Sequence, residues 1–268
     1  MTGEHRYTHG HAESVLRSHR WRTADNSAAY LLPHLEPGQA LLDVGSGPGT
    51  ITADLAELVA PGPVTALEHT AEAVELTRAE LERRGLQQVV VRRGDVHDLP
   101  FDDASFDVVH AHQVLQHVAD PVRALRELAR VTRPGGVVAV RDSDYAAFVW
   151  HPVSPELDRW LALYRGLARA NGGEPDAGRR LLAWAHSAGL DDVTVSSSTW
   201  TFATPADRAW WGGLWADRLL DSAFGNQLLE TGRATPTQLQ EMADGWRAWA
   251  DEPDGWFAVL HGELLVRC

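Results

Sequence analysis

Residues 40–50 read Ala-Leu-Leu-Asp-Val-Gly-Ser-Gly-Pro-Gly-Thr, an apolar run that leads directly into a glycine-rich turn. A helical pattern begins at Ile51, so this stretch predicts a strand, a tight turn and a helix in succession. Glycines let the backbone turn sharply and let a ligand approach the N–H groups at the start of a helix. The turn is therefore a candidate binding loop, although glycine-rich turns also serve as plain connectors.

Short apolar runs and helical patterns alternate outward from this loop, as far as about residue 142. Strands are predicted at Ala40–Val44, Val64–Glu68, Val89–Arg93, Phe106–Ala111 and Val137–Arg141, with helices such as Ala71–Arg84 and Pro121–Val131 between them. Strands separated by helices of this length are joined by right-handed crossovers. The pattern therefore predicts an α/β fold whose parallel sheet is covered on both faces.

The pattern changes after residue 142. Three Ser/Thr-Pro pairs predict helix starts, because a hydroxyl caps the first turn and proline lacks only an N–H that the helix would not use. Helices are expected at 154–170, 177–188, 205–221 and 235–250, and strands at Val193–Thr201 and Trp256–Val266. The two strands would complete the sheet as an antiparallel pair, and three of the helices (154–170, 205–221 and 235–250) would lie over one edge. Residues 11–35 hold two further helical patterns, the second capped by Asp25 or Asn26.

Composition excludes several kinds of chemistry. All 24 basic residues are arginine, so no lysine is available for a Schiff base or a P-loop. The net charge of -13 argues against nucleic-acid partners, and a lone Cys268 excludes internal disulfides and cysteine zinc sites. No apolar run reaches the roughly 18 residues of a membrane span, and no secretory signal opens the chain. A cytoplasmic location is expected.

Two acidic residues stand at strand ends beside the loop. Glu68 lies nineteen positions after Gly49, where a carboxylate can accept hydrogen bonds from both ribose hydroxyls. Asp95 is placed to accept from an adenine amino group while Val96 packs on the ring. A solvated strand end and a loop cap are the plainer interpretations of the two carboxylates. The run 106–117 brings the end of the fourth strand to the same crevice, where open α/β sheets bind ligands.

Several motifs occur together and in order along the chain. They are residues 42–50, Glu68, residues 94–101 (Gly-Asp-Val-His-Asp-Leu-Pro-Phe), the Leu-Gln-His at 115–117 and the Arg-Pro-Gly-Gly at 133–136. In combination they resemble a class I S-adenosylmethionine-dependent methyltransferase, closest to the ubiquinone/menaquinone-biosynthesis type and its small-molecule relatives. The resemblance is strong over about residues 38–145.

The resemblance implies a Rossmann-like, seven-stranded, mostly parallel sheet with helices on both faces and an antiparallel last strand pair. Residues 1–37 would form a helical lid, 38–145 the S-adenosylmethionine-binding core, and 146–268 the rest of the sheet with inserted cap helices. The implied cofactor-binding residues are Asp43, Gly45, Ser46, Gly47, Gly49, Thr50, Glu68, His69, Gly94, Asp95, Val96, Ala111, His112 and Gln113.

The implied reaction is in-line transfer of a methyl group to a small, hydrophobic or aromatic metabolite at carbon, oxygen or nitrogen. Holding two partners in a near-attack geometry supplies much of such catalysis, and the protein then needs only to remove a proton. Candidate catalytic residues face the crevice or the lid, and they are Tyr7, His9, His112, Asp144 and Tyr145. No metal is expected, because the histidines at the N-terminus lack carboxylates in a defined order.

Ten of the 11 tryptophans follow residue 149, and Trp21 is the exception. Trp211 and Trp215 fall one turn apart on a predicted helix, which indicates helix packing or the wall of an aromatic acceptor pocket. An apolar late lobe also allows a homodimer. Two other functions use the same motifs: a nicotinamide-dependent oxidoreductase, which the GxGxG spacing disfavours against GxGxxG, and a non-catalytic S-adenosylmethionine-binding protein.

Overall fold

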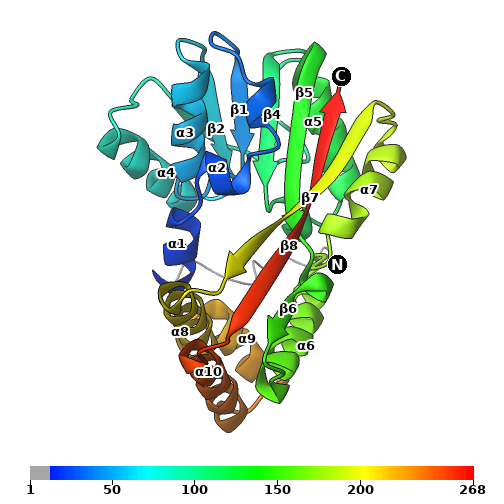
Figure 1. Ribbon diagram of the computed structural model, residues 1–268. Coiled ribbons are helices and arrows are strands. Elements are labelled where there is room, and N and C mark those ends of the chain that lie inside the picture. The colour runs from blue at the N-terminus through cyan, green and yellow to red at the C-terminus, as the bar shows by residue number, and fades with distance from the viewer. Residues whose placement is uncertain (1–12) are drawn as a thin grey trace.

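A computed structural model describes residues 13–268, which form one mixed sheet with helices on both faces and a helical lobe at one end (Figure 1). The strands are β1 (Leu41–Val44), β2 (Val64–Glu68), β3 (Val90–Arg93), β4 (Phe106–His112), β5 (Thr132–Ser143), β6 (Val149–His151), β7 (Val193–Phe202) and β8 (Trp256–Arg267). Their order is β3-β2-β1-β4-β5-β8-β6, and β7 pairs with β8. The seven predicted strands are confirmed, and β6 is an eighth that the sequence did not predict.

The strands from β3 to β5 are parallel, as predicted. The central strands β1 and β4 are almost entirely buried, as in sheets covered on both faces, whereas β3 is an exposed edge strand. Leu41 packs into one core cluster and its neighbour Leu42 into the cluster on the opposite face. The covering helices are α3 (Thr50–Val59), α4 (Ala71–Arg83), α5 (Pro121–Val131) and α7 (Leu181–Ala188). Short 3-10 turns lie at Leu32–His34, Leu115–His117, Tyr145–Ala147 and Gly178–Arg180.

The long strands β7 and β8 are antiparallel, and both extend beyond the parallel strands (Figure 1). Around their far halves stand α6 (Pro155–Ala170), α8 (Pro205–Asp221), α9 (Ala223–Glu230) and α10 (Pro236–Asp251). The lobe therefore lies beyond the carboxyl ends of the parallel strands, which is the edge of the sheet that its inserted helices cover. The three predicted proline helix starts are confirmed, with Ser154, Thr204 and Thr235 as caps.

The lobe is packed with aromatic rings. Trp160, Trp215 and Trp246 are almost completely buried in one cluster, with Trp160 in edge-on contact with the other two. Aromatic pairs in such geometry stabilise by about 0.5–1.5 kcal/mol beyond the area they bury. This cluster shows that part of the late tryptophans serve helix packing.

No helix among residues 13–268 is long and apolar enough to cross a membrane.

Two short helices precede the sheet, α1 (Glu13–Arg20) and α2 (Ala24–Ser27). The cap of α2 is Thr23, whose side chain accepts from the Asn26 N–H, while the Asn26 side chain accepts from the Thr23 N–H. The prediction of Asp25 or Asn26 as the cap is therefore wrong. Both residues lie within α2, and the hydroxyl of the capping box belongs to Thr23. Helix α1 packs against α8, so the N-terminal part touches the helical lobe.

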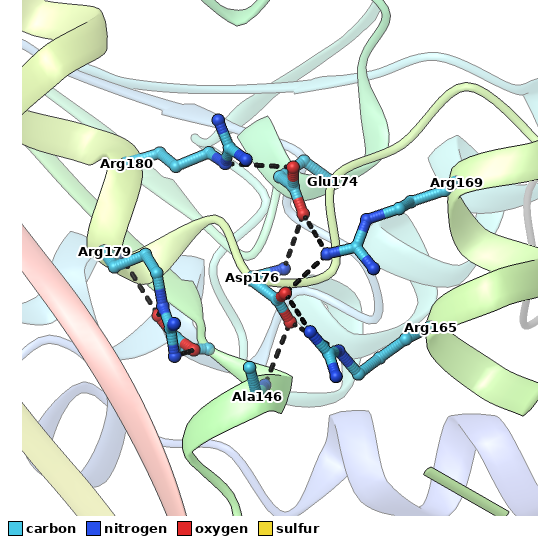
Figure 2. A network of polar contacts seen from close by, with 8 residues as sticks. Ala146, Arg165, Arg169, Glu174, Asp176, Arg179 and Arg180 are labelled. Atoms are coloured by element: carbon cyan, nitrogen blue, oxygen red, sulfur yellow. Dashed lines mark hydrogen bonds and ion pairs between the residues drawn. The ribbon is translucent and has the colours of Figure 1, made fainter. Parts of the chain in front are cut away.

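The loop after α6 is held on the sheet by arginine–carboxylate pairs (Figure 2). Asp176 accepts from Arg165 at 3.0 and 2.6 Å, from Arg169 at 2.5 Å and from the Ala146 N–H at 2.9 Å. Beside them, the Tyr145 N–H donates to the carbonyl of Pro175 at 3.1 Å. The network therefore fixes the turn that carries Tyr145.

We expect Asp176→Asn to lower the free energy of unfolding by about 1.5–3 kcal/mol at pH 7, the contribution of hydrogen bonds to a charged group. Burial raises the pKa of Asp176, but Arg165 and Arg169 outweigh it and hold the pKa below its ordinary value. The stabilisation is then fully present above about 3.9, the pKa of an aspartate in the unfolded chain. It is lost as the pH falls through the lower pKa that Asp176 has in the folded protein. Urea unfolding at pH 7 and pH 3 measures it.

The matched control is Asp244→Asn, which removes an exposed ion pair with Arg247 within one helix. Such pairs contribute about 0.3–0.5 kcal/mol. Equal destabilisation by the two substitutions would contradict a structural role for the network.

Candidate functional site

The glycine loop joins β1 to α3 at the carboxyl edge of the sheet. Gly45 has φ +73°, and a Cβ there would lie 2.4 Å from Cγ2 of Val114. A Cβ at Gly47, where φ is +55°, would meet no atom within 4 Å. The loop therefore needs glycine at position 45 to pass the neighbouring segment, and at position 47 it leaves its backbone open to the space beside it.

Polar side chains beneath the loop hold its shape. Thr77 on α4 donates to the carbonyl of Gly47 at 2.7 Å and lies 3.0 Å from the Ser46 hydroxyl. Asp43 is buried, accepts from the Thr52 hydroxyl at 2.5 Å and lies 2.8 Å from Nδ1 of His110. Asp43 thus positions the loop through side-chain partners, and His110 is fully buried.

Two carboxylates stand at the next strand ends. Glu68 accepts from the Gly47 N–H at 2.5 Å and from the His69 N–H at 3.0 Å. Asp95 accepts from the His97 N–H at 2.9 Å and lies 2.8 Å from its Nδ1. Burial raises the pKa of Asp95, but the bonds from His97 hold it below the ordinary value. Asp95 is therefore an ionised acceptor at neutral pH.

One cavity of about 570 Å³ joins these groups to the helical lobe. Most of the residues predicted to bind the cofactor line it: Asp43, Gly45, Ser46, Gly47, Thr50, Glu68, His69, Gly94, Asp95, Val96, His112 and Gln113. Gly49 and Ala111 do not; Gly49 caps α3 in a left-handed conformation, and Ala111 is buried within β4.

Aromatic residues and two arginines line the other part of the cavity. They are Trp21, Tyr145, Phe148, Trp200, Trp210, Trp211 and Trp215, with Arg22 and Arg218. The Trp21 ring lies 5.2 Å from Trp200 and 5.4 Å from Trp210, measured between centroids. The tryptophans thus both pack the lobe and wall the cavity, and Trp215 does both. Sequence reasoning did not assign Arg22 or Arg218 to the site.

His112 ends β4 at the boundary between the two parts of the cavity. Its ring centroid lies 5.8 Å from that of Trp200, and neither ring nitrogen has a hydrogen-bond partner among the described residues. Burial lowers the pKa of His112 well below its ordinary value, and the charge of Arg22 adds to this shift. The imidazole is therefore neutral at physiological pH, with a lone pair available for a proton.

Gln113 adopts a left-handed backbone conformation, φ +54°, directly after His112. Its amide nitrogen lies 2.8 Å from the Ser143 hydroxyl and 2.9 Å from Nε2 of His261, and its oxygen accepts from Arg22 at 2.9 Å. A non-glycine residue with such a φ costs energy, and strain of this kind clusters at functional sites. Gln113 therefore links the N-terminal segment to the ends of β4 and β5 and to the middle of β8.

The other predicted catalytic residues have different positions. Asp144 is buried, accepts from the backbone and guanidinium of Arg179, and does not line the cavity. Tyr145 does line it and is stacked on Tyr164 at 4.1 Å between centroids. Burial raises the pKa of Tyr145, so its phenol is protonated. Tyr7 and His9 lie outside the described residues.

The polar and apolar groups at this end of the cavity fit S-adenosylmethionine. The open backbone at Gly47 and the Glu68 and Asp95 carboxylates face one cavity, and Val96 supplies an apolar surface beside them. Carboxylates suit hydroxyl and amino donors, and an apolar side chain suits a planar base. The neutral His112 stands beyond them, toward the aromatic part.

Comparisons with known proteins agree with this geometry. A family model described as a methyltransferase domain matches residues 42–140. The chain is 35% identical to the uncharacterized methyltransferase C1B3.06c of Schizosaccharomyces pombe, over 97% of this chain and 96% of that protein. It is also 35% identical to a demethylmenaquinone methyltransferase of Roseiflexus castenholzii, over 59% of this chain and 63% of that one.

The YcgJ protein of Bacillus subtilis has a similar structure, with a TM-score of 0.58 at 19% identity, covering 89% of this chain and 97% of that one. The oxidoreductase alternative finds no support in these relatives. The near full-length match to a methyltransferase, the glycine loop and the paired carboxylates together place the chain in the class I S-adenosylmethionine-dependent methyltransferases.

Proposed function

We propose that the chain transfers a methyl group from S-adenosylmethionine to a small aromatic or hydrophobic acceptor held among the tryptophans, with His112 as the proton acceptor. The observation that carries the proposal is that one continuous cavity contains both a cofactor part and an aromatic part. The carboxylates of Glu68 and Asp95 line one part of the cavity, and aromatic rings line the other. The neutral imidazole of His112 stands between the two parts. Concave, largely apolar pockets with a few convergent polar groups are typical ligand sites.

The residues at the cofactor end would bind and orient. Glu68 would accept from the ribose hydroxyls, Asp95 from the adenine amino group, and Val96 would pack on the base. The N–H of Gly47 already points at the Glu68 carboxylate, at 2.5 Å, so loop and carboxylate are held together. S-adenosylmethionine, when bound there, supplies an electrophilic methyl group on a sulfonium sulfur.

The residues at the other end would orient the acceptor and exclude water. Trp200 is held by a hydrogen bond from its indole N–H to the Asn26 carbonyl, at 2.6 Å, so this wall is fixed from two distant segments. A ring nitrogen of His112 would take the proton that the acceptor loses. Positioning supplies most of the rate in such transfers, and general-base assistance contributes about 10²–10⁴-fold.

Incubation with methyl-labelled S-adenosylmethionine and a set of aromatic alcohols, amines and acids tests the proposal. We expect label in at least one aromatic product. Tight binding of S-adenosylhomocysteine without product from any acceptor would instead favour a non-catalytic S-adenosylmethionine-binding protein.

Three further expectations stay predictions. Tyr7 and His9 would belong to a lid over the cofactor. The enzyme would work without a metal ion, and the apolar helical lobe would allow a homodimer.

A further inference from the structure

We propose that the Ser143 hydroxyl donates a hydrogen bond to the methyl acceptor, and that the acceptor therefore carries an oxygen, such as a ketone carbonyl, that receives this bond. This inference rests on the proposed function, because it concerns the acceptor part of the same cavity. It adds Ser143 as a specificity-determining residue and narrows the class of acceptor.

The side-chain amide of Gln113 is turned in one direction by its neighbours. A guanidinium has donors and no acceptor, so the atom that faces Arg22 at 2.9 Å is the side-chain oxygen of Gln113. The amide nitrogen therefore faces the Ser143 hydroxyl at 2.8 Å and Nε2 of His261 at 2.9 Å. Arg22 thus decides which end of the amide meets the ends of the strands.

His261 fixes the same direction from the other side. Its Nδ1 lies 3.1 Å from the carbonyl of Val259, and a carbonyl only accepts, so Nδ1 carries the proton. Burial lowers the pKa of His261 well below its ordinary value, so the ring is neutral and Nε2 is an acceptor. One hydrogen of the Gln113 amide therefore goes to His261, and the other goes to Ser143.

The Ser143 hydroxyl is left with a hydrogen that it does not use within the chain. Its oxygen accepts from Gln113, and its own proton has no acceptor among the described residues. Ser143 is only 2% exposed, yet it lines the cavity together with Gln113. Buried polar groups are hydrogen-bonded in the great majority of cases, so the acceptor for this proton is expected on a ligand in the cavity.

Ser143 lies in the acceptor part of the cavity. It ends β5, and β4 and β1 separate β5 from β2, which ends at Glu68. Neighbouring strands lie about 4.8 Å apart, so about 14 Å of sheet separates Ser143 from Glu68. In the register of β5 and β8, Ser143 is opposite His261, whose ring centroid lies 4.3 Å from that of Trp200. The hydroxyl therefore stands beside the aromatic wall.

Ser143 and His112 would bind complementary groups of one acceptor. His112 comes from the adjacent strand β4 and lines the same cavity, and neither of its ring nitrogens has a partner among the described residues. The acceptor would give its proton to His112 and place a carbonyl-type oxygen at Ser143. An aromatic ring that carries both a hydroxyl and a ketone satisfies the two side chains and the tryptophan wall.

A double-mutant cycle with two matched probes measures this hydrogen bond in the full chain saturated with S-adenosylhomocysteine. The probes, 3-hydroxyacetophenone and 3-isopropenylphenol, share their ring, hydroxyl and outline, and they differ in a carbonyl oxygen against a CH₂ group. We expect the ketone-to-alkene affinity ratio, measured by calorimetry, to be at least about threefold higher in the native chain than in Ser143→Ala, within the range of one neutral hydrogen bond. Equal ratios, or failure of both probes to bind the saturated native chain, would overturn the inference.

Gln113→Glu separates donation by Ser143 from the filling of space. A carboxylate beside Arg22 has the same shape as the amide but only accepts, so Ser143 would donate to it and lose its hydrogen for the ligand. The affinity ratio should then fall to that of Ser143→Ala, although Ser143 itself is unchanged. The control is Ser187→Ala, an exposed serine on α7, which should keep the native ratio. A native ratio in Gln113→Glu would contradict the direction of these hydrogen bonds.

S-adenosylhomocysteine affinity, measured first for every protein, separates the two proposals. Failure of the native chain to bind it would overturn the proposed function itself, whereas native binding with equal probe ratios would overturn only the role of Ser143. A loss of S-adenosylhomocysteine affinity of about tenfold or more in Ser143→Ala would assign the hydroxyl to the cofactor instead, against the inference. If Ser143→Ala does not fold, Gln113→Glu and Ser143→Cys, which keeps the volume with only a weak donor, decide the question.

Discussion

Replacing Glu68 with alanine is expected to weaken S-adenosylhomocysteine binding by at least about tenfold. The carboxylate stands at the end of β2 and, at 2.5 Å, accepts from the Gly47 N–H, so it touches both the predicted ribose position and the glycine loop. Hydrogen bonds to charged groups contribute about 1.5–3 kcal/mol each, so even one lost bond gives this change. Isothermal titration calorimetry measures it directly.

The matched control is Glu75→Ala on α4, which removes an equal charge from an exposed ion pair with Arg78. This change should leave the affinity unaltered. Glu68→Gln should fall between native and alanine, because an amide keeps one acceptor and loses the charge. Native affinity in Glu68→Ala, with an unchanged melting temperature, would remove Glu68 from the proposed ribose role.

The parallel sheet could be predicted because its signals are local. The apolar run ending at Val44, the glycines that follow it and the acidic end of β2 lie within a few dozen residues of one another. Buried parallel strands read as continuous apolar runs, so β1 and β4 show their position in the sequence itself. Thr77 was missed, because nothing in its helix marks the hydroxyl that bonds to Gly47.

The acceptor part of the cavity depends on distant contacts that a sequence does not show. Arg218 bonds to Ser18, and Trp200 bonds to the carbonyl of Asn26, across 200 and 174 positions of the chain. No periodicity within α8 reveals which of its side chains meet the N-terminal segment.

Asp144 shows a different limit of prediction from sequence. It follows β5 at the expected edge of the sheet, yet its carboxylate faces Arg179 rather than the cavity. Placement at the end of a strand limits where a residue lies, but its partner decides where its side chain points.

Replacing His112 with asparagine is expected to lower the methyl-transfer rate by about 100-fold or more, the range of general-base catalysis, while S-adenosylhomocysteine affinity changes little. Asparagine keeps a polar side chain of similar reach but accepts no proton. His186→Asn, an exposed histidine on α7, is the matched control and should be neutral. Single-turnover measurements with labelled S-adenosylmethionine separate this loss in chemistry from any loss in binding. A variant that retains the native rate would show that His112 is not the base.

The pH dependence gives an independent test of the same role. Burial lowers the pKa of His112 well below its ordinary value, with Arg22 and Arg141 adding repulsion against the charged form. The neutral, proton-accepting form is therefore present above this low pKa, so the single-turnover rate should stay level from pH 8 down to about 6.5, the ordinary histidine pKa. In Arg22→Gln one repelling charge is gone, the pKa of His112 rises, and the acid limb of the rate should move to higher pH. An acid limb that stays in place when Arg22 is replaced would indicate that a different group accepts the proton.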